Sequence, residues 1–142
     1  MERLEPGEYL NDSLIDFYLK WWFNAKCSED VKEKCYAYST FFLTKLRALH
    51  NRKESSLDIY NKVRNWTRNV DILKKDYLFI PVNEWEHWTL MVVCFPGKIE
   101  EQIARHPRKS SIPKKATTPC ILYFDSLRGN AACTSQAKII RK

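Results

Sequence analysis

The 142-residue sequence lacks the features of several large classes of protein. No apolar run approaches the roughly 20 residues of a membrane-spanning helix, and Glu2 stands where a secreted protein has a basic and then apolar leader. The five cysteines are odd in number, scattered and without a C-x-x-C pair, which disfavours a disulfide framework or a zinc site. We therefore expect a soluble, intracellular protein that needs no metal or other cofactor.

Positive charge is concentrated in one part of the chain. The net charge is +7, and residues 97–118 contribute +4 of it. This stretch contains prolines and serines but no apolar periodicity, which predicts a basic loop insertion at about 97–119. A solvated loop is the simplest interpretation. The stretch has no interleaved aromatic residues, so a dedicated nucleic-acid module is disfavoured.

The first half of the chain has the apolar spacing of helices. Residues 8–23 fit an entry turn and an amphipathic helix that Asn11 or Asp12 caps, with one buried face made of Leu14, Ile15, Tyr18, Leu19 and Trp22. A second helix is predicted from Ser39 or Thr40, with Phe42, Leu43, Leu46 and Leu49 on one side. Ser56 is a candidate cap for a third helix, with Leu57, Tyr60 and Val63 along it.

The second half changes to short runs rich in β-formers. Residues 77–82, 88–95 and 120–124 predict three strands of one sheet. The nearly continuous apolar run at 90–95 is typical of a strand covered on both faces, so we expect helices packed on a sheet in an α+β fold. A last helix is predicted from Thr134, but the sequence stops about two turns later, which we interpret as truncation.

Two segments carry the residue types of a catalytic base and its orienting acid. Glu86-His87-Trp88 opens one predicted strand, and Phe124-Asp125-Ser126 closes another. A histidine and an acid placed in this way form two members of a catalytic triad. The pattern identifies no nucleophile. A packed or surface histidine without a catalytic role is the alternative interpretation of His87.

The order of the motifs resembles that of a known family. The motifs are Tyr9-Leu10-Asn11-Asp12 with Ile15-Asp16-Phe17-Tyr18, Ser39-Thr40-Phe41-Phe42, Asn65-Trp66-Thr67-Arg68-Asn69-Val70-Asp71, Ile80-Pro81-Val82, His87-Trp88 and Phe124-Asp125-Ser126. In this order they resemble the ubiquitin-like-protein-specific proteases, and the chain is similar to the first part of a sentrin-specific (SUMO-specific) cysteine protease domain. The resemblance implies a papain-like α+β fold, with N-terminal helices followed by a central sheet, truncated before the cysteine-bearing part.

The resemblance also implies roles for individual residues. His87 would be the general base and Asp125 the group that orients its imidazole, because the attacking cysteine must be a thiolate. Trp88 and Tyr9 would form the two walls of a tunnel that admits only the Gly-Gly tail of the modifier. Tyr9 as a packing residue beside the first helix is the alternative. Asp12 would pair with a basic residue of the modifier or serve only as a helix cap.

The chain departs from the common family pattern in two places. His87 and Asp125 are separated by the basic stretch, whereas compact members join these strands by a short hairpin. Such insertions resemble the branch called sentrin-specific proteases six and seven, which trims poly-SUMO chains. The Asp-Cys-Gly motif that supplies the nucleophile in the family is absent, and Cys133 and Gln136 lack its context. We therefore expect these 142 residues alone not to hydrolyse SUMO conjugates.

Two functions of different classes follow from the resemblance. The first is a SUMO-specific cysteine isopeptidase, cleaving after the Gly-Gly terminus of the modifier and represented here by a fragment without its nucleophile. The second is a non-catalytic SUMO-binding relic or regulatory isoform. Both predict SUMO or SUMO-conjugated proteins as partners, poly-SUMO chains included, and no membrane. In the second, the basic loop could also hold acidic partners or nucleic acid, although a dedicated nucleic-acid role is disfavoured. Trp66 is expected to pack rather than bind, and the resemblance implies a monomer in the nucleus.

Overall fold

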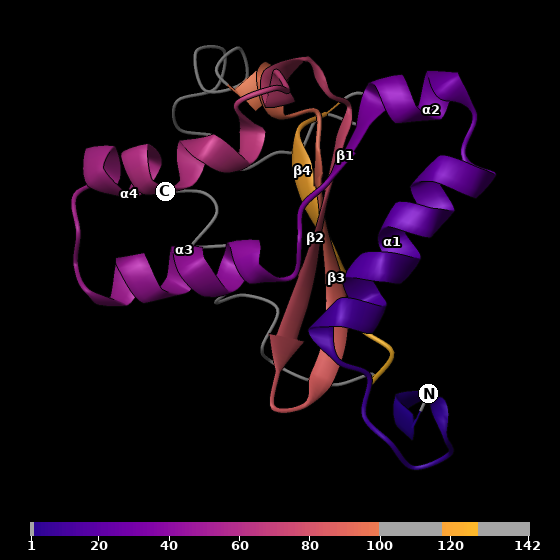
Figure 1. The fold of residues 1–142 in the computed structure, drawn as a ribbon. Helices are drawn as coiled ribbons and strands as arrows, with labels where there is room; N and C mark the ends of the chain where they lie inside the picture. The colour runs from indigo at the N-terminus through magenta and orange to yellow at the C-terminus, as the bar shows by residue number, and fades with distance from the viewer. Residues whose placement is uncertain (1, 100–117, 128–142) are drawn as a thin grey trace.

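The computed structural model describes residues 2–99 and 118–127 (Figure 1). Four α-helices of this part are α1 (Asp12–Lys26), α2 (Glu29–Lys34), α3 (Phe41–Asn51) and α4 (Ser56–Val63). Its strands are β1 (Cys35–Ala37), β2 (Tyr77–Glu84), β3 (His87–Cys94) and β4 (Cys120–Phe124). Short 3₁₀ helices are η1 (Glu2–Leu4), η2 (Arg64–Thr67), η3 (Ile72–Lys74) and η4 (Pro96–Lys98). None of these helices combines the length and apolar character that crossing a bilayer requires.

The four strands form one sheet in the order β1-β2-β3-β4. β1 is parallel to β2, and the other two pairings are antiparallel. The prediction of three strands from residue 77 onward is confirmed, but neither β1 nor α2 was predicted from the sequence. Three residues are too few for an alternating pattern, and the six-residue α2 has no buried residue that would mark an apolar face.

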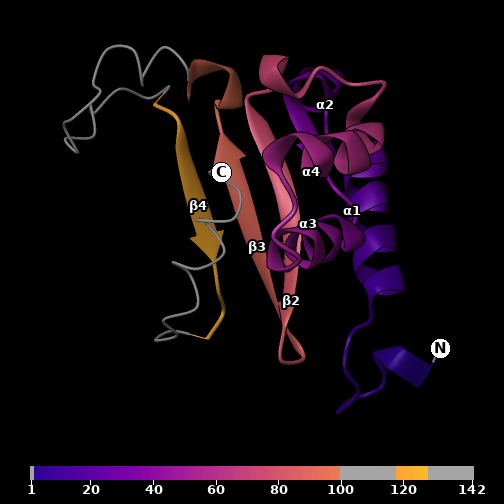
Figure 2. The ribbon, with the colours of Figure 1, turned by 90° about the vertical axis from the view of Figure 1, so that its left-hand side faces the viewer.

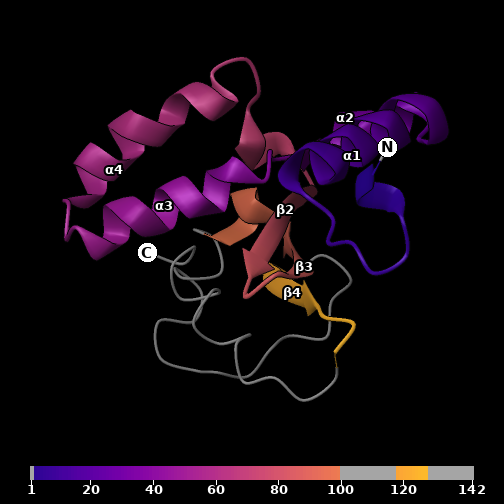
Figure 3. The same cartoon turned by 60° about the horizontal axis from the view of Figure 1, so that its bottom comes forward.

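Helices flank both faces of the sheet near β1 and β2. Figure 1 and Figure 3 show α1 and α2 on one side and α3 and α4 on the other, while Figure 2 shows β4 at the edge away from the helices. We refer to the two sides as the α1 face and the α3 face. The described residues therefore give an α+β layered arrangement, as the sequence predicted.

The α3 face holds the core. Tyr38 and two residues of α3, Phe42 and Leu43, pack against alternate residues of β2 and β3. These strand residues are Leu78, Ile80, Val82, Met91 and Val93. Tyr38 stacks on Phe42 with ring centroids 3.9 Å apart, and Trp66 of η2 meets Phe42 edge-on at 5.7 Å. The Trp66 carbonyl also accepts a hydrogen bond from the Tyr36 hydroxyl, so Trp66 packs against the core, as expected.

The α1 face is covered less completely. Trp22 and Phe23, near the end of α1, contact Phe79 of β2 edge-on. None of the residues of α1 is fully buried. The expected burial of Tyr18 is wrong, because the ring is 59% exposed and lies beside Trp21 instead. The apolar stripe of α1 therefore borders open space along part of its length.

Two helix starts are fixed by side-chain caps. The Asn11 side chain accepts a hydrogen bond from the Leu14 N–H at 3.0 Å, so Asn11 rather than Asp12 caps α1. Ser55, not Ser56, caps α4 through the Asp58 N–H, because Ser56 is already the first helical residue. Two apolar residues of α4, Leu57 and Tyr60, are exposed, at 69% and 59%.

A tight turn joins β2 to β3. Glu84 pairs with His87, which leaves only Trp85 and Glu86 in the loop, with φ of 53° and 62°. Two successive left-handed residues are the geometry of a type I′ hairpin turn, which glycine and asparagine adopt at least cost. The Trp85 side chain is 98% exposed at the tip. The turn sets the register that places His87 at the start of β3.

Several predictions fall outside the described residues. They are most of the basic insertion at about 97–119, the last helix from Thr134, and the surroundings of Cys133 and Gln136. Gly97, at the start of the predicted insertion, lies in η4 and is described. A Cβ on Gly97 would lie 2.1 Å from the Leu73 carbonyl oxygen, so no larger residue fits there without a shift of the backbone. Glycine at this position lets η3 and η4 approach closely.

Candidate active site

His87 and Asp125 meet at one end of the sheet. Leu90 lies opposite Phe124 in the β3–β4 register, so extending the ladder by one residue puts Asp125 diagonally across from His87. His87 Nε2 and Asp125 Oδ1 are 2.6 Å apart. The two side chains are 26% and 17% exposed, so the pair is accessible at its edge. The structure therefore places in contact two side chains, from different strands, that the sequence predicted to act as base and acid.

The Asp125 carboxylate is held by two donors. Besides its contact with His87, Oδ1 accepts a hydrogen bond from the Leu127 N–H at 2.8 Å. The hydrogen bond from His87, followed by that from Leu127, keeps the pKa of Asp125 below its ordinary value. An ionised Asp125 fixes the His87 tautomer that carries its proton on Nε2. Nδ1 then remains as the nitrogen that can accept a proton from another group.

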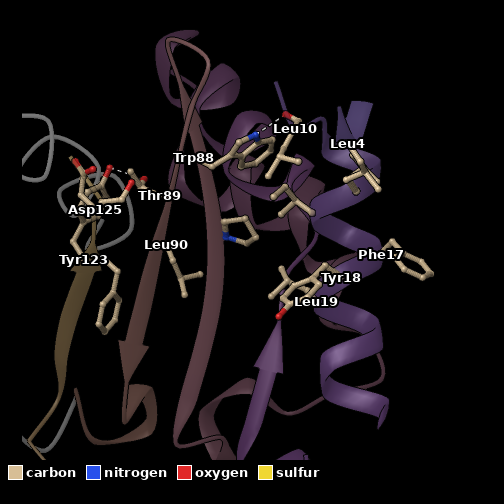
Figure 4. A pocket seen from close by; sticks show the side chains of 15 residues that line it. Leu4, Leu10, Phe17, Tyr18, Leu19, Trp88, Thr89, Leu90, Tyr123 and Asp125 are labelled. Atoms are coloured by element: carbon tan, nitrogen blue, oxygen red, sulfur yellow. Dashed lines mark hydrogen bonds between the residues drawn. The ribbon is translucent and has the colours of Figure 1, made fainter. Parts of the chain in front are cut away.

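Trp88 is positioned by the segment that precedes α1. Its indole Nε1–H donates a hydrogen bond to the Leu10 carbonyl at 2.8 Å, although the two residues are 78 positions apart. Figure 4 shows this bond beside the groove between α1 and the strands. Since Asn11 caps α1, the same turn that starts the helix also presents the Leu10 carbonyl to Trp88.

An apolar groove of about 1010 Å³ lies beside the pair. Side chains from the α1 side and from β3 and β4 face one another across it (Figure 4). Its lining includes Leu10, Tyr18, Trp88, Leu90, Phe124 and Asp125. The groove could hold an extended apolar or backbone segment whose end reaches the His87–Asp125 pair.

The remaining predicted site residues lie near this groove. Tyr9 is 61% exposed and stands next to Leu10, but none of the ring contacts in the described residues joins it to Trp88. Asp12 is the first residue of α1 and half-buried, and none of the ion pairs in the described part includes it. Both residues are placed where a bound segment could reach them, without a contact that assigns their role.

Sequence reasoning missed the residues that support the pair. Glu84, the cross-strand partner of His87, forms an ion pair with Arg47 of α3, and both side chains are largely buried. Thr89 Oγ1 donates to the Tyr123 hydroxyl at 2.8 Å, which ties β3 to β4 beside the pair. Residues so distant in the chain give no local sequence signal, and neither Arg47 nor Thr89 lies in a motif.

No described cysteine can reach His87. Cys94 is the last residue of β3, whereas His87 is the first, so they lie about 23 Å apart along the strand. The register places Cys35, Tyr77, Cys94 and Cys120 in one row across the four strands. Cys27, which ends α1, interacts electrostatically with Cys35 of this row. The described part of the chain therefore brings His87 and Asp125 together but places no cysteine beside them.

Comparison with known sequences decides the family. A family model described as the Ulp1 protease family, C-terminal catalytic domain, matches residues 8–141. The chain belongs to the Ulp1 protease family. Relatives of this Ulp1-family chain include sentrin-specific protease 7 of Rattus norvegicus, 34% identical over 90% of the chain, and probable ubiquitin-like-specific protease 2A of Arabidopsis thaliana, 35% identical over 92%. The human sentrin-specific protease 7 is 44% identical over 72%.

Solved structures show the same fold. One described as the de-sumoylating protease covers 94% of the Ulp1-family chain with a TM-score of 0.63 at 25% identity. The Ulp1 protease domain in complex with Smt3, the yeast ortholog of SUMO, covers 99% with a TM-score of 0.62 at 23% identity. The chain spans 44% and 50% of these two solved chains and 17% and 16% of the rat and Arabidopsis relatives. The papain-like α+β fold of this family, expected from the sequence, is confirmed.

Proposed function

We propose that these residues are the base-bearing part of a SUMO-specific cysteine isopeptidase domain. The observation that carries the proposal is the 2.6 Å contact between His87 Nε2 and Asp125 Oδ1 beside an apolar groove. Relatives named sentrin-specific proteases support the choice of SUMO as the modifier. The reaction would cleave the bond that follows the Gly-Gly terminus of the modifier and would require no cofactor.

His87 would act as general base and Asp125 as the group that orients it. Asp125 holds Nε2–H, which leaves Nδ1 to accept the proton of a cysteine thiol. The resulting thiolate attacks the carbonyl carbon of the last glycine, and the imidazolium then returns the proton to the departing lysine amine. Water hydrolyses the thioester with the same imidazole as base. The ionised carboxylate of Asp125 stabilises the imidazolium in both halves of the reaction.

The groove would bind the tail of the modifier. Trp88 is fixed over it by the bond to the Leu10 carbonyl, and Tyr9 is exposed next to that carbonyl. Two aromatic walls would exclude any residue with a side chain, so the passage would select glycines and hold the scissile bond in an extended conformation. Asp12 would pair with a basic residue of the modifier just outside the passage.

The domain assignment is part of the same proposal. Residues 1–142 would be a partial catalytic domain with a basic insertion at about 97–119. Similarity to sentrin-specific proteases 6 and 7 supports membership of the insertion-bearing branch and poly-SUMO chains as a substrate. We further propose that the protein acts as a monomer, inside the cell and in the nucleus, by analogy with that branch.

A second function is favoured by the positions of the cysteines. Because three of the described cysteines lie at the far end of the sheet and Cys27 ends α1, the described residues could bind SUMO without cleaving it. In this non-catalytic form the protein would be a SUMO-binding relic or regulatory isoform. The two functions differ in one respect, which is whether the natural protein provides a cysteine opposite His87.

A SUMO whose terminal glycine carries a thiol-reactive group separates the two functions. The natural protein, purified from its source, is incubated with this probe and its labelled peptide is sequenced. An isopeptidase is labelled at a cysteine within Asp-Cys-Gly, and the His87→Ala variant loses the labelling while the Glu54→Gln variant, remote from the groove, keeps it. Absence of labelling together with measurable SUMO binding indicates the non-catalytic function. Labelling or turnover that depends on Cys133 contradicts the prediction that these 142 residues alone are inactive.

A further inference from the structure

The end of the sheet opposite His87 carries a row of thiols. Cys35, Cys94 and Cys120 occupy three of the four positions in this row, and Tyr77 holds the fourth. Cys94 and Cys120 are direct partners on neighbouring antiparallel strands. Cys35 is two strands away from Cys94, about 9.6 Å, with Tyr77 between them. Among these three, only Cys94 and Cys120 are therefore neighbours.

The spacing of Cys94 and Cys120 suits a covalent bond. Residues directly opposite in an antiparallel ladder have Cα atoms about 4.5 or 5.5 Å apart, and disulfides span Cα separations of about 4.4–6.8 Å. Their side chains project from the same face of the sheet, and the two thiols lie within hydrogen-bonding reach of each other. The bond can therefore form without any change in the pairing of β3 with β4.

The two thiols differ in exposure. Cys120 lies on the edge strand β4 and is exposed, whereas Cys94 is buried, with 4% of its surface accessible. Burial, with the neighbouring Cys120 as a smaller cause, raises the pKa of Cys94. A small oxidant therefore meets Cys120 first, and Cys94 is protected from solvent and stands beside it as the second thiol.

We propose that Cys94 and Cys120 form a reversible cross-strand disulfide that ties β4 to β3, with a low-molecular-weight disulfide such as glutathione disulfide as the oxidant. This redox modification site is separate from the groove and does not depend on the proposed function. Ladder pairs have Cβ atoms slightly farther apart than an unstrained disulfide prefers, which makes the bond easy to reduce. The fraction of protein that carries the disulfide therefore follows the ratio of reduced to oxidised glutathione around it.

The reaction takes two exchange steps. The Cys120 thiolate attacks one sulfur of glutathione disulfide, forming a mixed disulfide and releasing one glutathione thiolate. The Cys94 thiolate then attacks the Cys120 sulfur and releases the second glutathione. The protein loses two electrons and the protons of two thiols, and two glutathione molecules leave reduced, with the protons passing to them through water.

The bond would act on the geometry of the groove end through β4. In the described part, β4 pairs with β3 alone, and Asp125 follows directly at its end. A bond between Cys94 and Cys120 anchors the first residue of β4, so fraying of the strand from that end is suppressed. The oxidised protein would then hold Asp125 near His87 with fewer excursions of the edge strand.

Equilibration with glutathione buffers tests the site. The purified protein is incubated across a series of reduced-to-oxidised glutathione ratios, remaining thiols are alkylated, and a non-reducing digest is analysed by mass spectrometry. We expect a linked peptide pair that contains Cys94 and Cys120 and that disappears on adding dithiothreitol. The melting temperature of the oxidised protein should rise by about 5 °C or more, because the bond closes a loop of the unfolded chain.

Matched variants separate this bond from other cysteine chemistry. Cys120→Ser replaces an exposed thiol without emptying the core and should abolish the linked peptide and the thermal shift. Cys35→Ser changes a cysteine of the same row and should preserve both. The proposal is overturned if Cys120 ends as a glutathione adduct only, if it links to any cysteine other than Cys94, or if the linked protein melts at the temperature of the reduced form.

Discussion

The two faces of the sheet are covered to different extents by the described residues. On the α3 face, Leu43 and Met91 are 2% and 0% exposed. On the α1 face, the outer residues Leu122 and Phe124 of β4 are 44% and 55% exposed, and a groove of about 1010 Å³ separates α1 from the strands. The same strands thus supply a closed core on one side and an open apolar surface on the other. Stability should reside mainly in the first and ligand recognition in the second.

The largest expected difference between the faces is in core truncation. Leu43→Ala should lower the free energy of unfolding by about 2–5 kcal/mol, because it leaves a cavity among packed neighbours. Leu122→Ala, the matched truncation on the α1 face, should cost under about 1 kcal/mol, since the side chain is already partly in water. Urea unfolding measures both. Equal losses would show that the α1 face is as closely packed as the core.

Removing the cap of α1 tests how much that cap stabilises the segment that borders the groove. Asn11→Ala should cost about 1 kcal/mol, because the Leu14 N–H loses its acceptor at the start of the helix. Ser13→Ala is the control, because Ser13 is the second residue of the helix and is exposed, so its replacement should change stability little. Thermal unfolding gives the values. The cap variant should also shift the NMR signal of the Trp88 indole N–H, since that N–H bonds to the carbonyl of Leu10, which precedes Asn11. An unchanged signal would separate the cap from the groove.

Acid titration examines the His87–Asp125 pair beside the groove. The pKa of folded Asp125 lies below its ordinary value of 3.8, so the ionised carboxylate stabilises the folded protein above about pH 4. That contribution is lost as pH falls through the lower folded pKa. We therefore expect wild type to be more stable than Asp125→Asn near neutral pH and the two to converge in acid. The effect should be smaller than that of the cap, because solvent screens the accessible pair.

Parallel urea titrations of the two proteins across this pH range measure the convergence. Asp71→Asn is the control, since Asp71 caps η3 through the Leu73 N–H and none of the described contacts joins it to His87. A gap between wild type and Asp125→Asn that widens toward acid would contradict the assigned direction of the pKa change.

The smallest change in stability is expected at the turn that joins β2 to β3, since these two strands contribute to both faces of the sheet. Glu86→Gly should stabilise the protein by about 0.5 kcal/mol, because relief of the left-handed conformation slightly exceeds the entropy that glycine loses on folding. Glu86→Ala keeps a Cβ at the same φ and should give no gain. Denaturant midpoints distinguish them. A loss of stability in the glycine variant would show that the turn is not strained.

The sequence predicted those parts of the molecule that repeat a pattern. The long apolar runs of β2 and β3 and the cap-plus-stripe of α1 were located within a few residues. The three-residue β1 was missed because its pairing depends on β2, which lies 42 positions later in the chain. The burial of Tyr18 was wrongly predicted, because helical periodicity shows which residues share one face of a helix but not how far that face lies from the sheet.

The sequence predicted two residues of the candidate site but not the contacts that support them. His87 and Asp125 were singled out because a histidine that opens one strand and an acid that closes another are the residue types of a base and its orienting acid, and the structure places them in contact. The Leu10 carbonyl that fixes Trp88 could not be found, since a backbone oxygen has no sequence signature. The ion pair of Arg47 with Glu84 could not be predicted either, because it depends on how α3 packs on β2 in three dimensions.

The strand order has a consequence for how the site forms during synthesis. Because the order in the sheet is the order in the chain, each strand can pair with one that has already left the ribosome, and the sheet grows from β1 toward β4. His87 enters with β3, but Asp125 follows β4, the last strand of the series. A nascent chain that has released only three strands therefore holds His87 without Asp125, and the contact between them forms when β4 docks on β3.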